Sequence, residues 1–356
     1  MAQEVQFAHV ASGARIAWAS QGRGPPLLRA AHWMTHVAHD PTSPVWQPWL
    51  SRLGRQLRVL RYDERGCGMS GPDETPLDLE TAVEELEAVA DAAGLKRFAL
   101  LGISGGAPAA IAYAARHPDR VSHLVLLGPY ACGVMAGTPS AEQVAWVDAT
   151  ARLIELGWGR AGSPVQQFFT ASLIPGGTQE QVQSLNEQQR LCCGPERAAA
   201  LLRARTRLDV RALLPQLRCP TLVMHSQWDA TIALEAGRAV AAAIGGARFV
   251  ELPSRNHSPL AGEPAFEQFC DALTHFVCTP KTAQTDSPAG DATGTFTPRE
   301  RELLALVAQG RDNLQIAAQM GLADKTVRNA LSQLYTRLAV EGRPQAVVKA
   351  RELGFG

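Results

Sequence analysis

The sequence has no excess of either charge and no uninterrupted hydrophobic run that would cross a membrane. Its 34 Lys and Arg residues balance 34 Asp and Glu residues, so a contact with nucleic acid must come from a local basic patch. The most apolar segment, residues 98–115, contains Gly, Ser and Pro, which favours a buried strand followed by a packed helix. We therefore expect no membrane partner.

The N-terminus also lacks a secretory pattern, because no basic segment followed by an apolar one occurs in MAQEVQFAHV. The seven cysteines are an odd number without the spacing typical of metal sites, although Cys192 and Cys193 are adjacent. We interpret them as reduced thiols that serve mostly in packing. These absences predict a cytoplasmic protein with no metal and no cofactor.

Composition divides the chain into two parts. Residues 279–295, TPKTAQTDSPAGDATGT, are rich in Thr, Ser, Pro, Gly and Asp and show no apolar periodicity, which is typical of a flexible linker. We predict a larger domain over residues 1–278 and a small domain over residues 296–356.

Short apolar runs alternate with helix-like stretches in the larger part. The predicted strands are 27–28, 59–62, 98–101, 121–127, 221–225 and 248–252, and the predicted helices are 78–93, 107–116, 234–244 and 265–277. This alternation predicts an α/β domain with a mainly parallel sheet and helices on both faces. The interval from about 130 to 217 breaks the alternation, and we interpret it as a helical lid over a pocket.

A candidate nucleophile follows the predicted strand at 98–101. The stretch Gly102-Ile-Ser104-Gly-Gly106 fits the pattern G-x-S-x-G, in which the glycines permit a sharp turn from strand to helix. Asp229 and His257 each stand just beyond a later predicted strand, in the order that a Ser-Asp-His triad on such a sheet requires. Taken singly, the glycines fit a tight packing turn, Asp229 a helix N-cap and His257 an ordinary loop histidine. The ordered set favours the triad.

These motifs resemble the α/β-hydrolase superfamily over roughly residues 4–277. The stretch YDERGCGMS, residues 62–70, is similar to the family's Y-D-x-R-G-x-G-x-S turn, and HPDRV, residues 117–121, matches the link after the nucleophile helix. The resemblance implies that the backbone N–H groups of Trp33 and Gly105 form an oxyanion hole. Family members often carry His-Gly where this chain has Ala-His32-Trp33. We expect His32, Trp33, Ser104 and His257 to line a ligand pocket.

Three histidines in the same loop raise the question of a metal site. His32, His36 and His39 would face one side of a helix, but Pro41 and Pro44 follow closely and no second group of ligands accompanies them. The pattern therefore favours loop histidines.

The small part has apolar residues at helical spacing in four segments, 298–309, 313–320, 324–338 and 344–353. FTPRERE, residues 296–302, KTVRN, residues 325–329, and LYTRL, residues 334–338, resemble the LuxR-type helix-turn-helix domain. The resemblance implies an all-α domain whose helix from Asp324 enters the major groove of DNA. We expect DNA contacts from Lys325, Thr326, Arg328 and Asn329, and core positions at Val327, Leu331 and Leu334. From Gly294 onward, nine Lys and Arg residues against six Asp and Glu residues leave a net charge of +3.

Several functions fit these features. One is a ligand-responsive transcription regulator that binds a small ester, lactone or carboxylic acid in the hydrolase-like pocket and binds promoter DNA as a homodimer, with slow hydrolysis of the ligand as an open extension. Another is an active serine hydrolase of the esterase or lactonase type with a secondary DNA-binding module. A third is a constitutive DNA-binding protein that dimerises through its hydrolase domain.

Overall fold

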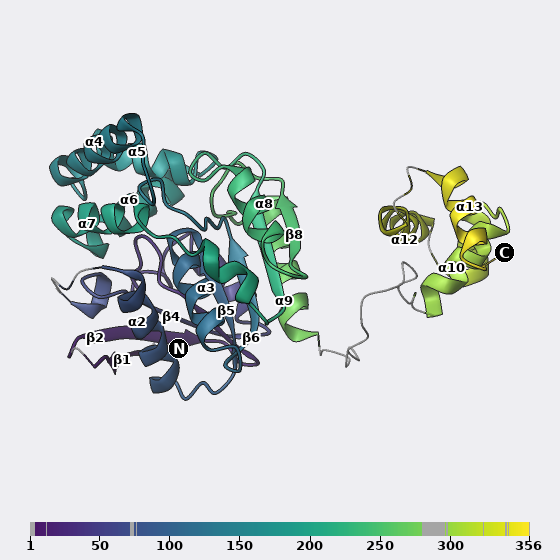
Figure 1. The fold of residues 1–356 in the computed structure, drawn as a ribbon, viewed down its shortest axis with the longest axis horizontal. Coiled ribbons are helices and arrows are strands. Elements are labelled where there is room, and N and C mark those ends of the chain that lie inside the picture. The colour runs from purple at the N-terminus through teal and green to yellow at the C-terminus, as the bar shows by residue number, and fades with distance from the viewer. Residues whose placement is uncertain are drawn as a thin grey trace. The chain divides into compact units, whose positions relative to one another are not determined.

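The computed structural model describes residues 4–11, 13–71, 75, 77–279, 296, 298–322, 324–338, 340 and 342–355. Contacts divide the chain into two compact units, Met1–Pro280 and Lys281–Gly356 (Figure 1). All of the predicted linker except Thr279 lies outside the described residues, and each unit is described by itself.

An eight-stranded sheet forms the centre of the larger unit, in the order β1-β2-β4-β3-β5-β6-β7-β8. The strands are β1 (Val5–His9), β2 (Arg15–Gln21), β3 (Pro26–Arg29), β4 (Arg58–Tyr62), β5 (Phe98–Ile103), β6 (Val121–Leu127), β7 (Thr221–Ser226) and β8 (Arg248–Leu252). The pairs β1–β2 and β2–β4 are antiparallel, and the remaining pairs are parallel. The prediction of a mainly parallel sheet is confirmed.

Helices cover both faces of this sheet. One apolar cluster joins it to α1 (Gln47–Leu53) and α9 (Pro264–Cys278), and a second joins its other face to α2 (Leu79–Ala92), α3 (Ala107–Arg116) and α8 (Leu234–Ala242). Neighbouring residues of one strand belong to opposite clusters, as Leu100 and Leu101 do, because side chains alternate across a strand. Because β3, β5, β6, β7 and β8 are parallel neighbours, their carboxyl ends lie along one edge of the sheet.

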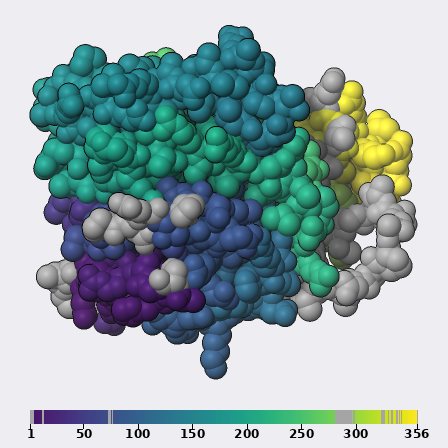
Figure 2. Space-filling model, turned by 60° about the vertical axis from the view of Figure 1, so that its left-hand side comes forward, coloured from purple at the N-terminus to yellow at the C-terminus, as the bar shows by residue number. Residues whose placement is uncertain are grey.

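The segment predicted as a lid contains α4 (Ala141–Gly157), α5 (Pro164–Leu173), α6 (Gln179–Cys192), α7 (Pro195–Thr206) and the 3-10 helix η3 (Arg211–Gln216). Ser140, Ser163 and Thr178 cap the first three helices through their side-chain oxygens, which satisfies backbone donors at the helix starts. In Figure 2 these helices, teal to green, form the upper part of the larger unit. The guanidinium of Arg197 in α7 donates to the carbonyl of Arg65, 2.7 Å away, and so ties the segment to the sheet domain.

The described part of the smaller unit contains four helices, α10 (Pro298–Ala308), α11 (Asn313–Met320), α12 (Asp324–Arg337) and α13 (Arg343–Glu352). Asp312 caps α11, and Gly321 ends it in the left-handed conformation that glycine tolerates. Val327, Leu331 and Leu334 are buried in its core, which confirms their predicted role. The all-α prediction is also confirmed.

None of the helices in the described part of the chain combines the length and apolar character needed to span a bilayer. The apolar segment 98–115 is occupied by strand β5 and helix α3 instead.

Candidate functional site

Ser104 lies in a sharp turn between β5 and α3. Its φ of +48° is in the left-handed region that residues other than glycine rarely adopt. A Cβ atom on Gly102 would lie 2.8 Å from the Cα of Ala107, and one on Gly106 would lie 2.7 Å from the carbonyl oxygen of Ala31. The flanking positions therefore require glycine, and the turn holds Ser104 half-buried at the carboxyl edge of the sheet.

The two other residues predicted for the triad are in direct contact. His257 Nδ1 donates to Asp229 Oδ2 over 2.6 Å, and the two side chains are almost fully buried, at 3% and 0% exposure. Although burial alone raises the pKa of Asp229, hydrogen bonds from His225 and His257 hold it well below its usual range. The carboxylate is thus ionised and orients the imidazole.

Asp229 also organises its own loop. Its Oδ1 accepts the backbone N–H of Thr231 at 2.8 Å and of Ile232 at 3.2 Å. Helix α8 begins after Ala233, which is its N-cap, so the alternative of Asp229 as a helix N-cap is wrong. His225 Nε2 lies 3.5 Å from Asp229 Oδ2 and donates to the Ile232 carbonyl at 2.9 Å. The sequence did not point to His225, although this residue lies near the end of β7, the strand that precedes Asp229.

The imidazole of His257 lies over the end of β6. Ser104 and Gly128 follow residues that are paired between β5 and β6, so they are neighbours across the sheet. A Cβ atom on Gly128 would lie 2.9 Å from His257 Cε1. His257 Nε2 is buried and has no hydrogen-bond partner among the described residues. Ser104, Asp229 and His257 therefore all follow the carboxyl ends of strands in one sheet, and the His257 ring lies next to the end of β6, the neighbour of the strand that precedes Ser104.

A lid arginine covers the two residues predicted for the oxyanion hole. The guanidinium carbon of Arg205, in α7, lies 5.8 Å from the centre of the Trp33 ring, and a Cβ atom on Gly105 would lie 2.7 Å from Arg205 Nε. Arg205 Nη2 donates to Glu64 Oε1 at 2.7 Å, whereas Nη1 is buried without a partner in the described part of the chain. A cation with an unused donor therefore lies next to these residues.

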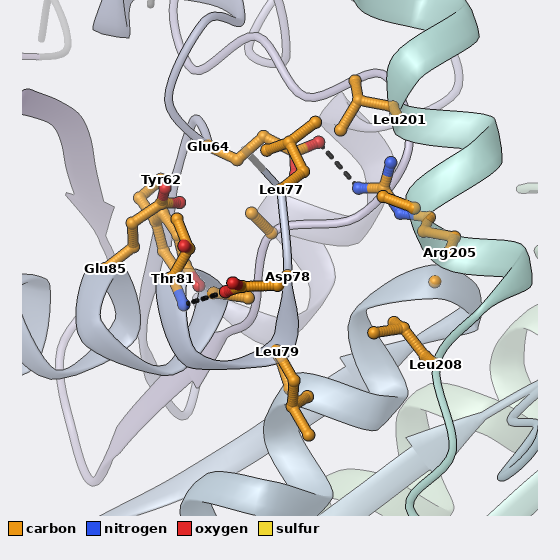
Figure 3. A pocket seen from close by; sticks show the side chains of 15 residues that line it. Tyr62, Glu64, Leu77, Asp78, Leu79, Thr81, Glu85, Leu201, Arg205 and Leu208 are labelled. Atoms are coloured by element: carbon orange, nitrogen blue, oxygen red, sulfur yellow. Dashed lines mark hydrogen bonds and ion pairs between the residues drawn. The ribbon is translucent and has the colours of Figure 1, made fainter. Parts of the chain in front are cut away.

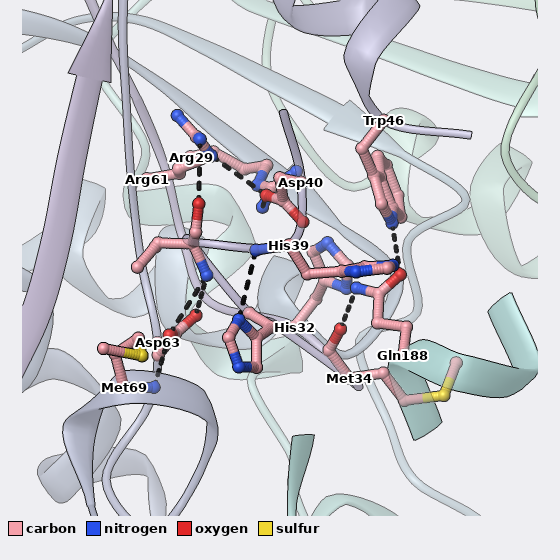
Figure 4. Close-up of polar contacts among 12 residues, drawn as sticks. Arg29, His32, Met34, His39, Asp40, Trp46, Arg61, Asp63, Met69 and Gln188 are labelled. Atoms are coloured by element: carbon pink, nitrogen blue, oxygen red, sulfur yellow. Dashed lines mark hydrogen bonds and ion pairs between the residues drawn. The ribbon is translucent and has the colours of Figure 1, made fainter. Parts of the chain in front are cut away.

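His32, which precedes Trp33 in the loop after β3, is a buried, neutral group (Figure 4). Its Nδ1 donates to the carbonyl of Trp33 at 2.7 Å, and its ring lies 5.2 Å from that of Trp46. Burial, together with the nearby charges of Arg29 and Arg205, lowers the pKa of His32 well below its ordinary value. Because the single proton of the neutral ring is on Nδ1, the buried Nε2, which has no partner among the described residues, can only accept a hydrogen bond and suits a ligand O–H or N–H group.

Buried charges fix the loop that carries His32 and Trp33. Asp40 accepts from Arg29 at 2.8 Å and from Arg61 at 2.9 Å, and Asp63 accepts the backbone N–H of Val37 at 2.9 Å (Figure 4). From the lid, Gln188 donates to the carbonyl of Met34, whose φ is +64°. The loop is therefore held from the sheet and from the lid.

The histidines of this loop do not gather around a metal position. The rings of His36 and His39 are 6.4 Å apart, and His36 Nδ1 accepts the backbone N–H of His39 at 3.2 Å. The three cysteines Cys67, Cys192 and Cys193 do gather, with their sulfur atoms within 4.8 Å of one another. The sequence did not predict this cluster, because Cys67 lies far along the chain from Cys192 and Cys193.

A small pocket next to Arg205 contains two buried carboxyl groups (Figure 3). Glu64 and Glu85 line it with Tyr62, Gly105 and Arg205. Burial raises the pKa of Glu64 to about 7, and burial together with the charge of Glu64 raises that of Glu85 to about 8. Both groups titrate near neutral pH, beside the cation that covers Gly105.

The Glu85→Gln variant should depend less on pH than the wild type. Because the folded chain binds the Glu85 proton more tightly than the unfolded chain, this group's stabilisation falls as the pH rises from about 4.5 to about 8. We expect the melting temperature of Glu85→Gln to gain on the wild type over this range. The readout is the difference in melting temperature between the variant and the wild type at each pH. The lowered pKa of His32 makes both proteins more stable as the pH rises, and this contribution cancels in the difference. Glu80→Gln, exposed on the same helix, is the control. A difference that stays constant with pH would contradict the prediction.

In the smaller unit, the residues predicted to contact DNA all belong to α12. Thr326 and Arg328 are exposed, and Val327 between them is buried in the core. The side chains of Lys325 and Asn329 lie outside the described residues. Val327, Leu331 and Leu334 lie at helical spacing and form the buried face of α12, so Thr326 and Arg328 lie outside that face.

Comparisons with known proteins agree with both halves of this description. The family model "alpha/beta hydrolase fold" matches residues 38–264, more than half of the chain. The model "Bacterial regulatory proteins, luxR family" matches residues 294–350.

Individual relatives divide in the same way. RutD of Klebsiella pneumoniae (strain 342) is 28% identical over 220 residues, which are 60% of this chain and 79% of RutD. The DNA-binding transcriptional activator DevR/DosR of Mycobacterium tuberculosis is 30% identical over 145 residues, 41% of this chain and 64% of that regulator. A solved hydrolase from Pseudomonas aeruginosa PA01 superimposes with a TM-score of 0.61 at 26% identity, over 78% of this chain and 99% of its own. The chain belongs to the α/β-hydrolase fold family and carries a C-terminal domain of the luxR family of bacterial regulatory proteins.

Proposed function

We propose that this protein is a cytoplasmic, homodimeric transcription regulator. It binds a small molecule at the carboxyl edge of the sheet, near Ser104 and His257, and it binds DNA through α12. The observation that carries the proposal is the fusion itself, in which a lid-covered site with a buried Asp229–His257 pair shares one chain with a luxR-family domain. A ligand that contacts both the lid and the sheet domain favours one arrangement of them, and this differential binding shifts the equilibrium between regulator states.

The test is DNA binding with and without ligand. Full-length protein is incubated with DNA from upstream of its own gene and of the adjacent genes, and mobility shifts are measured with short-chain esters, acyl lactones and their carboxylic acids. We expect a shift whose midpoint changes with at least one of these compounds. Absence of a shift in every condition would contradict the regulator, and a shift that no compound alters would favour a constitutive DNA-binding protein.

Hydrolysis of the ligand is the second candidate function. The left-handed turn at Ser104 and the unpaired Nε2 of His257 favour it, since a serine nucleophile needs a neighbouring base. We expect a fluorophosphonate probe to label the wild type once per chain and to leave Ser104→Ala unlabelled. Ser172→Ala, a lid serine that bonds the Phe168 carbonyl, is the control. Equal labelling of wild type and Ser104→Ala would exclude Ser104 as the nucleophile.

Arg205 favours a ligand that carries a carboxylate or a strongly polarised carbonyl. Its buried Nη1 is available for a charge-assisted hydrogen bond next to Gly105. We expect Arg205→Met to lose turnover of the mono-4-nitrophenyl ester of succinate by tenfold or more, about the value of one such bond, while turnover of 4-nitrophenyl acetate changes less. Arg203→Met, which alters a half-exposed arginine of the same helix, is the control. An equal loss for both esters would show that Arg205 only supports the lid.

A further inference from the structure

Three cysteines from two separate segments meet where the lid contacts the sheet domain. Cys67 precedes the 3-10 helix η1 (Gly68–Ser70) in the turn after β4, and Cys192 and Cys193 end helix α6. Their sulfur atoms all lie within 4.8 Å of one another. Cys67 and Cys192 are buried and Cys193 is half-buried, so the cluster is largely shielded from solvent.

The distances suit a shared cation. Zinc–thiolate bonds are about 2.3 Å long, so three thiolates around one ion lie about 4 Å apart. Within the described residues this is the one group of three or more cysteine, histidine or acidic side chains close enough to share an ion. Small side-chain rotations would close the remaining gap.

Charged side chains border the cluster. Cys67 Sγ lies 4.0 Å from Glu64 Oε1, which accepts from Arg205 Nη2 at 2.7 Å. A metal ion binds cysteine as the thiolate, so the thiols release their protons when the ion binds.

We propose that Cys67, Cys192 and Cys193 form a binding site for a thiophilic d10 cation of the Zn(II), Cd(II) and Cu(I) class. Soft thiolate ligands select such ions. Binding forms three metal–sulfur bonds, releases to solvent the protons still held by the thiols, and displaces water from the hydrated ion, with no change of oxidation state. The bonds join the turn after β4 to the lid helix α6, close to Arg205 and therefore to the edge that carries Gly105.

Cd(II) titration of the reduced full-length chain tests the site. We expect a thiolate-to-metal charge-transfer absorbance that saturates at one equivalent and disappears in the triple variant Cys67→Ser/Cys192→Ser/Cys193→Ser. Zn(II) should compete for the same equivalent. Cys219→Ser and Cys270→Ser, which remove buried cysteines outside the cluster, should titrate as the wild type does.

A direct view of the ligands guards against misfolding of the triple variant. X-ray absorption of the wild type with one equivalent of Cd(II) should show three sulfur neighbours. No stoichiometric absorbance in the wild type, an absorbance that persists in the triple variant, or fewer than three sulfur neighbours would each overturn the proposal.

Discussion

Replacing Asp229 with Asn is expected to slow fluorophosphonate labelling of Ser104 by up to about 10⁴-fold, the loss seen when a triad loses its carboxylate with its geometry intact. Asn keeps an oxygen for the N–H groups of Thr231 and Ile232, so the loop should persist. It cannot stabilise a positively charged His257, and its amide favours the wrong tautomer of that ring. The measurement is the labelling rate followed by intact-protein mass.

Asp271→Asn is the matched control, because this exposed carboxylate on α9 pairs with Arg52, a residue outside the triad. Its labelling rate should equal that of the wild type. If Asp229→Asn labelled at the wild-type rate with an unchanged melting temperature, the Asp229–His257 pair would be structural and the ligand-binding role would stand without catalysis.

The core of the candidate site could be predicted from the sequence because each part has a local signature. Ser104 lies between glycines that the turn requires, and Asp229 and His257 lie in the loops that follow the apolar runs of β7 and β8. Parallel strands bring their carboxyl ends to one edge, so positions more than a hundred residues apart meet there. The roles of the three residues stay predictions, although their placement matches the pattern.

Arg205 could not be predicted in the same way. Helix α7 also carries Arg197 and Arg203, and helical spacing alone does not tell which of the three faces the pocket. That depends on the angle at which the lid crosses the sheet, which is set by contacts such as Arg197 with Arg65.

The thiol cluster was missed for a related reason. Metal motifs are recognised from pairs of ligands at short spacing, and only Cys192 and Cys193 are close in sequence. Cys67 joins them because α6 ends above the turn after β4.

Replacing Arg328 with Ala is expected to weaken binding of the full-length protein to its operator DNA by about 1–3 kcal/mol, roughly 5- to 150-fold. Arg328 is exposed on α12 and, at about 100° per residue, its side chain lies outside the face that Val327 buries in the core. If it contacts a base edge, the loss should be confined to the operator. If it contacts a phosphate, binding to all DNA should fall and the salt dependence should decrease by about one counterion.

Arg299→Ala, an exposed arginine on α10, removes the same charge outside the proposed recognition helix. Comparing both variants with the wild type at several salt concentrations separates the loss of a specific contact from the general effect of lowering the positive charge. Equal affinities for the two variants would contradict a particular role for Arg328. A larger loss for Arg328→Ala would place α12 against the DNA, because both variants change the domain's net charge by the same amount.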